Sequence, residues 1–308
     1  HPRSSVMKAV IVLSGLAGLV IFGPPVLRSR VHHPEISVIV HEHARSVDRH
    51  VDQSDCRFEA ERSVTSSAGS VQELRLQAGS GSLEVVGVEG LGEVRAVARA
   101  CASHEEFLDD LQLTTEAEGS TLVMETHYPD FSGWRSGNRY ARLDLMVEVP
   151  AGLAADIKDG SGEIEVTGLG STLIKDGSGE VVIGGLNGDL TIEDGSGELE
   201  ISGVSGWLVL HDGSGEVVVE GVGGDVEIHD SSGELEIRGI AGSLTLYDSS
   251  GEVDVEDVMG SVTVVQDSSG DISVRGVGGD FTVQRDGSGG INYSDVEGAV
   301  KIPKKRGR

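Results

Sequence analysis

Apolar residues recur at fixed offsets along the C-terminal half of the chain. In one stretch they occupy Leu199, Ile201, Val204, Leu208 and Leu210, and the same offsets return in the two repeats that follow. The first two and the last two of these residues are each separated by a single residue, which is the period of a strand with one buried face. Glycine recurs often between them and no period of 3.6 residues is present, so a helical interpretation fails.

A short turn, DGSG or DSSG, accompanies every copy of this pattern. Its aspartate opens eight copies, at Asp159, Asp176, Asp194, Asp212, Asp230, Asp248, Asp267 and Asp286. The copies are 17 to 19 residues apart. A fixed period of this length indicates one supersecondary unit per repeat, stacked on its neighbours. The sequence therefore predicts an all-β fold, a single-stranded β-solenoid (β-helix) of coils of about 18 residues with two short strands per coil.

The pattern is interrupted near its start. "AGSGSLEVVGVEG", from Ala78, matches the repeat unit with alanine in place of the aspartate. "SHEEFLDDL" then predicts a short helix with Ser103 as its cap, and "LQLTTEAEGSTLVMETHY" predicts a hairpin that turns about Glu118 and Gly119. We therefore expect residues 102–150 to be an insertion that caps or flanks the first coils.

The chain divides into five segments by composition. Met7, the expected initiator, and Lys8 are followed by 15 uncharged residues, so residues 1–30 are expected to be a signal peptide or an N-terminal membrane anchor. Residues 31–55 form a linker. Residues 56–150 form an N-terminal β region with the first coil and the capping insertion. Residues 151–303 hold the regular repeats, and residues 304–308 form a basic tail.

Charge and cysteine content narrow the class of protein. The chain has 308 residues and a formal net charge of −27. Residues 159–300 hold 29 Asp and Glu against four Lys and Arg, which excludes nucleic acid as the expected partner. Cys56 and Cys101 are the only cysteines. In an exported chain they predict one disulfide bond, with two unpaired thiols as the alternative.

The order of these segments resembles a known family. The isolated "AGSGSLEVVGVEG" is followed by a variable stretch, by "LDLMVEVPAGLAADIKDGSGEIEVTGL" and by the repeats. Over residues 58–302 this order is similar to the bacterial putative-adhesin family of exported domains of unknown function. The resemblance implies a β-solenoid and a location in the cell envelope, and it provides no catalytic residues. This chain departs from the family pattern in the regularity of its turns and in its acidity.

The repeated turn favours architecture over chemistry. An EF-hand would need an acid two positions before each aspartate and a glutamate at the twelfth position, and neither is present. A nucleophile elbow would place glycine two residues from the serine rather than next to it. We expect the aspartate to accept hydrogen bonds from amides two residues on. The second glycine is never replaced, so it is expected to adopt the strained corner conformation, whereas the first is replaced by serine in three copies.

Stacking the coils would place acidic residues in columns about 4.8 Å apart. We call these columns the cation ladder, and we expect them to attract divalent ions diffusely, without a defined coordination site. No cofactor is therefore expected, and Ca²⁺ is the one ion to test. The members of the ladder are Asp159, Asp176, Asp194, Asp212, Asp230, Asp248, Glu163, Glu180, Glu198, Glu216, Glu234 and Glu252. His211 and His229 share another column, which is expected to be an exposed mixed column rather than a metal site.

A separate recognition site would lie in the least repetitive segment. Residues 127–140, "HYPDFSGWRSGNRY", combine aromatic residues, arginine and loop glycines. The residues of this candidate recognition loop are Tyr128, Phe131, Trp134, Arg135 and Tyr140. The alternative interpretation is a cap that covers the apolar end of the first coil.

These observations favour a non-enzymatic exported protein, an adhesin-like scaffold or interaction module of the envelope or surface with an acidic face. One alternative is a structural module stabilised by divalent cations. The other is a carbohydrate-active β-helix enzyme, which would need paired carboxylates in a groove and aromatic platforms. We expect a monomer in the periplasm, at the outer surface or anchored in the membrane by an uncleaved N-terminal segment. The expected partner is an unidentified bacterial envelope or surface component.

Overall fold

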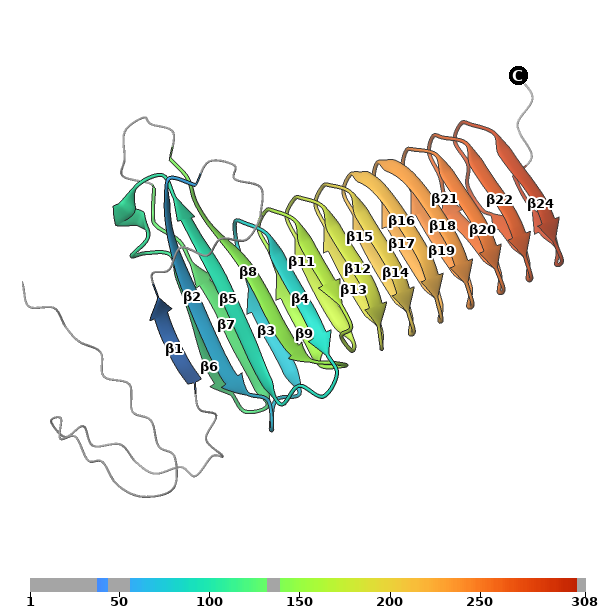
Figure 1. Cartoon of the computed structure of the whole chain (residues 1–308). Helices are drawn as coiled ribbons and strands as arrows, with labels where there is room; N and C mark the ends of the chain where they lie inside the picture. The colour runs from blue at the N-terminus through green and yellow to red at the C-terminus, as the bar shows by residue number, and fades with distance from the viewer. Residues whose placement is uncertain (1–37, 44–55, 132–138, 304–308) are drawn as a thin grey trace, which may run out of the picture. The chain divides into compact units, whose positions relative to one another are not determined.

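The computed structural model describes residues 38–43, 56–131 and 139–303, which form 25 β-strands and one 3-10 turn. The strands belong to two sheets, one of 13 strands and one of 12. In the regular part the chain alternates between the sheets and advances by one coil each time (Figure 1). The predicted β-solenoid of coils of about 18 residues is therefore confirmed.

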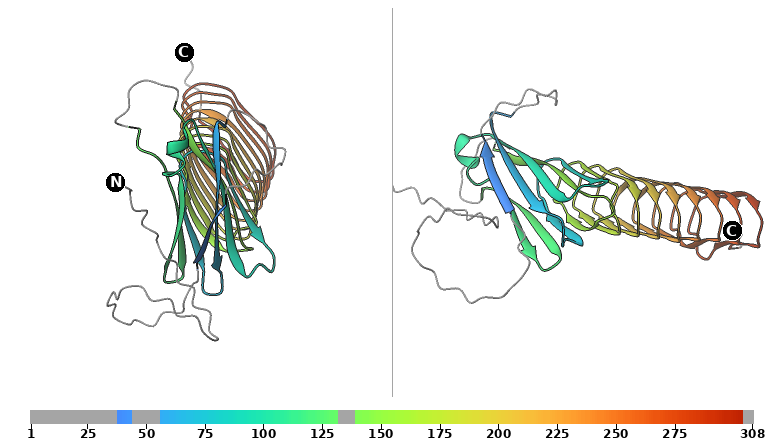
Figure 2. Two further views of the ribbon diagram at one scale, coloured as in Figure 1. Left: turned by 60° about the vertical axis from the view of Figure 1, so that its left-hand side comes forward. Right: turned by 60° about the horizontal axis from the view of Figure 1, so that its bottom comes forward.

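Each regular coil contributes one strand to each sheet. In the regular coils, the strands that belong to the 13-stranded sheet are β10 (Ile164–Thr167), β12 (Val181–Leu186), β14 (Leu199–Val204), β16 (Gly215–Val222), β18 (Gly233–Ile240), β20 (Val253–Val258), β22 (Ile272–Val277) and β24 (Ile291–Val296). Those of the 12-stranded sheet are β9 (Ala154–Lys158), β11 (Thr172–Asp176), β13 (Leu190–Asp194), β15 (Leu208–Asp212), β17 (Val226–Asp230), β19 (Leu244–Asp248), β21 (Val262–Gln266), β23 (Phe281–Val283) and β25 (Val300–Lys301). Figure 2 shows the two sheets edge-on.

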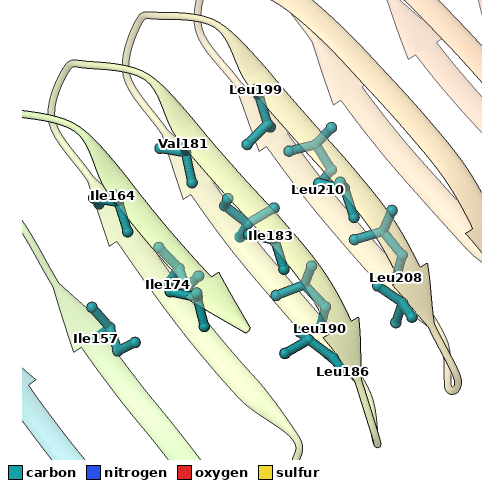
Figure 3. Packing of buried hydrophobic residues seen from close by; sticks show 14 of the residues in the cluster. Ile157, Ile164, Ile174, Val181, Ile183, Leu186, Leu190, Leu199, Leu208 and Leu210 are labelled. Carbon is teal, nitrogen blue, oxygen red and sulfur yellow. The ribbon is translucent and has the colours of Figure 1, made fainter. Parts of the chain in front are cut away.

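The strands pair in parallel and in register, so like residues stack. Leu199 pairs with Val217 in the first sheet, and Leu208 pairs with Val226 in the second. Side chains of the repeated apolar positions fill the space between the sheets (Figure 3). The interior of the regular coils is an aliphatic core in which Leu190, Ile192 and Leu199 have no exposed surface. Burial of such a side chain contributes about 1.5–3 kcal/mol before the loss of chain entropy is counted.

The first coil is out of sequence order. It consists of β3 (Glu73–Gln77) and β4 (Leu83–Val88). β4 lies between β8 (Ala141–Pro150) and β10, and β3 lies between β7 (Thr121–His127) and β9, with parallel pairing throughout. The coil that precedes the insertion in the sequence thus stacks directly on the coil that follows the insertion.

Antiparallel strands close the N-terminal end of the stack. β5 (Glu93–Ala102) pairs with β8, β2 (Phe58–Ser67) pairs with β5, and β1 (Val38–His43) pairs with β2. β6 (Gln112–Glu118) and β7 form the hairpin expected from the sequence, with Gly119 at φ 66° in its turn. The 102–150 segment therefore supplies both a further coil level and part of the cap.

The predicted helix after Ser103 is wrong. Residues Glu105–Phe107 form only a single 3-10 turn, and the residue at its N-cap position is His104, whose side chain makes no capping hydrogen bond. The Oγ of Ser103 instead accepts a hydrogen bond from the Tyr140 amide at 3.2 Å. Because Phe107 is buried against the core, tertiary packing holds this segment in a compact turn.

The predicted signal or anchor segment 1–30, much of the linker 31–55 and the basic tail 304–308 lie outside the described residues. Within the part that is described, no helix has the length and apolar character needed to cross a membrane.

Candidate functional site

The corner turn of each coil is shaped by its second glycine. This glycine has a φ between 140° and 152° in seven of the eight copies. A Cβ added at Gly197 would lie 1.6 Å from the carbonyl oxygen of Gly179, the equivalent glycine of the preceding coil. The predicted strained corner is therefore confirmed, and only glycine fits it. The first glycine of the turn, such as Gly195, has no positive φ, in agreement with its replacement by serine elsewhere.

The aspartates that open these turns point into the solenoid. Those of the inner copies are between 2% and 8% exposed, which overturns the view of this column as a solvated surface ladder. The physical reason is strand alternation, because Asp194 stands two residues after Ile192 and shares its face. The buried aspartates are Asp176, Asp194, Asp212, Asp230, Asp248 and Asp267, and we call them the buried aspartate column.

Burial raises the pKa of four carboxyl groups of the column, those of Asp176, Asp212, Asp248 and Asp267. Burial, with hydrogen bonding to Asp230 as the next cause, raises the pKa of Asp212 to about 7. Burial and hydrogen bonding to Asp267 raise the pKa of Asp248 to about 8. Burial and repulsion from Asp159 and Asp194 raise the pKa of Asp176 to about 6. The column is thus an interior acidic cluster that favours protonation near neutral pH.

Only part of the predicted turn hydrogen bonding is present. Asp230 Oδ1 accepts a hydrogen bond from the Ser232 amide at 3.2 Å, and Asp248 Oδ1 accepts one from Ser250 at 3.1 Å. While ionised, neither oxygen accepts a hydrogen bond in Asp176, Asp194, Asp212 and Asp267, and a bond such as that between Asp212 and Asp230 requires one of the two carboxyl groups to be protonated. The turn is therefore held chiefly by glycine geometry and backbone pairing between coils rather than by the aspartate side chain.

The glutamates of the predicted ladder lie outside. Glu163, Glu180, Glu198, Glu216, Glu234 and Glu252 are all exposed. In-register pairing places Glu216 opposite Glu234 on adjacent strands. The structure thus separates the ladder into an exposed glutamate column and the buried aspartate column. Among the described residues, no group of three or more His, Cys, Asp or Glu side chains is arranged to hold a metal ion.

A column of stacked rings lies on the outer face of the 12-stranded sheet. The rings of His211 and His229 are 4.6 Å apart, and those of His229 and Tyr247 are 4.2 Å apart and almost parallel. Each stacked ring covers the face of its neighbour, so the faces a sugar would need are largely occupied. Next in the column, Lys175 Nζ contacts Glu193 at 2.6 Å.

An open groove runs along the turns near the C-terminal end of the stack. It is lined by Asp257, Asp295, Glu297 and the 76% exposed side chain of Met259, among others. Asp257 and Asp295 have φ values of 58° and 54°, at positions where most coils have glycine. The groove has carboxylates but no aromatic lining residue, so it lacks the platform expected of a carbohydrate-active site.

The described residues of the candidate recognition loop contact the cap. The hydroxyl of Tyr128 accepts a hydrogen bond from the Ser80 amide at 2.9 Å and donates one to the Ser80 carbonyl at 3.0 Å. Phe131 packs edge-on against Phe107, and the Tyr140 hydroxyl accepts a hydrogen bond from the Arg57 amide. Trp134 and Arg135, which the sequence also singled out, lie outside the described residues.

Cys56 and Cys101 form a disulfide bond, with a Cα–Cα distance of 5.5 Å. Cys56 lies two residues before the first residue of β2, and Cys101 is the next-to-last residue of β5 and is fully buried. The bond therefore ties the start of β2 to the end of β5 within the cap.

Comparisons with known proteins show similarity to one sequence family and to two solved structures. The sequence model of a family described as Toastrack DUF4097 matches residues 93–288. A solved structure of a putative cell adhesion protein from Clostridium sporogenes is 15% identical, and the match covers 80% of this chain and 100% of that one with a TM-score of 0.29. A putative adhesin from Bacteroides fragilis is 12% identical, with 80% and 98% covered and a TM-score of 0.38. Comparison with curated proteins gave no match.

Proposed function

We propose that this chain, which belongs to the Toastrack DUF4097 family, is a non-enzymatic exported scaffold of the bacterial envelope or surface. Its acidic solenoid would serve as an adhesin-like interaction surface. The observation that carries this proposal is the separation of roles within each coil. Aliphatic side chains and glycine corners maintain the stack, while exposed glutamates recur in six successive coils, from Glu163 to Glu252, and their side chains form no ion pair with the described residues of their own coil.

The exposed glutamate column is suited to a partner that is itself extended and cationic. Adjacent members stand about 4.8 Å apart because the strands that carry them pair in parallel. Residues 159–300 hold only four basic residues, and Arg238 and Arg275 are already paired with glutamates such as Glu256. The face therefore keeps a negative potential that a polycationic or positively charged surface component would neutralise.

Location is the first part of the proposal to test. A tagged full-length chain, expressed in a bacterium, is expected in the envelope fraction and to be cleaved by protease added to intact cells or spheroplasts. A disulfide in the cap supports an oxidising compartment. Recovery of the intact, reduced chain only from the cytoplasm would overturn the proposed export.

The interaction surface is tested by charge-neutral substitutions. We expect Glu198→Gln, Glu216→Gln and Glu234→Gln together to weaken binding of the purified protein to isolated envelopes, and to reduce the salt dependence of that binding. The control is Glu89→Gln, Glu116→Gln and Glu125→Gln, which removes the same charge from exposed residues outside the column. Equal loss in both variants would show that net charge, rather than the column, determines binding.

A further inference from the structure

The buried aspartate column has a geometry that is not needed for a turn. Each member from Asp176 to Asp248 is the last residue of its strand, and each of them as far as Asp230 pairs in register with the aspartate of the next coil. Asp267 and Asp286 continue the column through a parallel bridge. The six residues from Asp176 to Asp267 are at least nine-tenths buried, so their neighbouring carboxyl groups face one another away from water.

The column has no cationic partner in the interior. The interior residues that follow each corner on the other sheet are apolar: Val181, Leu199, Val217, Leu235 and Val253. The charged and titratable residues that directly precede the aspartates, namely Lys158, Lys175, Glu193, His211, His229, Tyr247 and Arg285, lie on the outer side of their strands. The glutamates after the turn, from Glu163 to Glu252, are exposed, as is Asp271.

The two ends of the column also lack a positive charge. Next to Asp159 the stack continues with Ala78 in the aspartate position, since Ser80 pairs with Ser161. The hydroxyl of Tyr128 covers that corner and is already bonded to Ser80. At the other end Asp286 is half-buried. No described group therefore neutralises the column from outside.

If every carboxyl group of the column were ionised, the only donors to them would be the amides bonded to Asp230 and Asp248. Both oxygens of Asp194 and of Asp212 would then be buried without a hydrogen-bond donor. A proton on one carboxyl group supplies the missing donor, because the protonated group donates a hydrogen bond to the carboxylate in the next coil. The same proton removes one of two adjacent buried charges.

We propose that the buried aspartate column is a proton-binding site in which protons are shared between carboxyl groups of adjacent coils, and that their loss loosens the coil stack. The absence of any three-residue metal-binding group among the described residues favours protons over a divalent cation. This goes beyond the scaffold function, since it makes the rigidity of the scaffold depend on pH.

The direction in which stability depends on pH follows from the raised pKa values of the column. A carboxyl group with a higher pKa in the folded than in the unfolded chain binds more protons when folded, between the two values. The pKa of Asp176 is raised from 3.8 to about 6, that of Asp212 to about 7 and that of Asp248 to about 8, in each case first by burial. Their contribution to stability is complete below pH 3.8 and is lost as the pH rises through about 6 to 8.

The first experiment uses the unmodified full chain. We expect the midpoint temperature of unfolding to fall as the pH is raised from 5 to 8.5 at constant ionic strength. We also expect unfolding at pH 6 to release about two protons per chain, measured by the buffer dependence of the calorimetric enthalpy. A midpoint that is flat or rises over this range, or unfolding without proton release, would overturn the proposal.

Substitution localises the protons. Asp212→Asn with Asp230→Asn keeps the side-chain size and provides an uncharged donor, so this variant is expected to lose less stability between pH 5 and 8.5 than the unmodified chain. The control, Glu216→Gln with Glu234→Gln, removes the same charge from the exposed column of the same two coils and should keep the full pH dependence. Equal flattening in both variants would assign the effect to general repulsion.

Two further measurements do not depend on how the variants fold. The infrared carbonyl band of protonated carboxyl groups, after exchange into heavy water, is expected in the folded unmodified chain at pH 6.5 and should disappear by pH 9. Calcium, compared with magnesium at matched ionic strength, should change the midpoint no more than magnesium does. A saturable calcium effect at pH 8.5, together with no protonated band at pH 6.5, would identify the column as a cation site instead.

Discussion

The second glycine of each corner turn is determined by contact between coils. At Gly215 the φ is 152°, and an added Cβ would lie 1.6 Å from the carbonyl oxygen of Gly197. Because the same approach is repeated at the other levels, a side chain at this position would have to push the corner away from its neighbour. The first glycine is not in this conformation, and Ser231, Ser249 and Ser268 take its place.

We therefore expect Gly197→Ala to lower the free energy of unfolding by about 3 kcal/mol or more, since it combines a clash with a strained φ. Gly184→Ala is the matched control. The Cβ it adds would meet Thr167 Cγ2 at an ordinary 3.5 Å and should change stability by no more than about 1 kcal/mol. Both are read from thermal unfolding at one pH. Similar effects of the two substitutions would mean that the corner relaxes freely.

At this scale the sequence predicted the corner glycine but not the burial of the aspartate. The alternation Leu190, Ile192, Asp194 contained the signal, because it places the aspartate on the interior face. Aspartate is mostly exposed in folded proteins, so residue type alone predicts a solvated carboxylate at this position. The paired arrangement of the carboxyl groups depends on stacking between coils, which no single repeat contains.

Elements with a local cause were predicted from the sequence, and those chosen by tertiary packing were not. The β6–β7 hairpin follows from a turn at Gly119 between two strand-like segments. The position of β3 and β4 between later strands has no local signal, since β4 pairs with β10 across an insertion. The Ser103 helix was predicted from a cap residue whose hydroxyl is bonded elsewhere in the structure.

The disulfide gives a prediction for the strands of the cap. Cys56→Ala with Cys101→Ala should destabilise the N-terminal region by about 2–5 kcal/mol, because the bond closes a separation of 45 residues. The measurement is thermal unfolding with and without reductant. Reductant should lower the midpoint of the unmodified chain to that of the double variant and leave the variant unchanged. A variant that still responds to reductant would contradict this assignment.

The whole solenoid carries an excess of like charge. Residues 159–300 have a net charge of −25, and three of their four basic side chains form bridges between coils, as Arg238 does with Glu220 at 3.8 Å and with Glu256 at 3.6 Å. Such exposed bridges contribute about 0–1 kcal/mol each. They do not offset the repulsion along the exposed columns. Burial of the aliphatic core must therefore stabilise the stack against the electrostatic repulsion between its acidic residues.

We expect sodium chloride to raise the midpoint of unfolding between about 0.01 M and 0.15 M, over which the screening length falls from about 30 Å to 8 Å. The effect should level off above this range, because the acidic residues of one coil are then screened from those of distant coils. The triple Glu198→Gln, Glu216→Gln, Glu234→Gln variant should show a smaller rise. A midpoint that falls with salt would indicate that the bridges outweigh the repulsion.

The displaced coil formed by β3 and β4 has a consequence for the order in which the chain assembles. Its neighbours on one side are β7 and β8 and on the other β9 and β10, all of which are synthesised later. The earliest coil therefore cannot bury its first face until residue 150 has been made, nor its second until residue 167, whereas each later coil is added to one that already exists. In an exported chain, this delay would keep the first half of the polypeptide extended while it crosses a narrow translocation channel, and the remainder would then wind up level by level behind it.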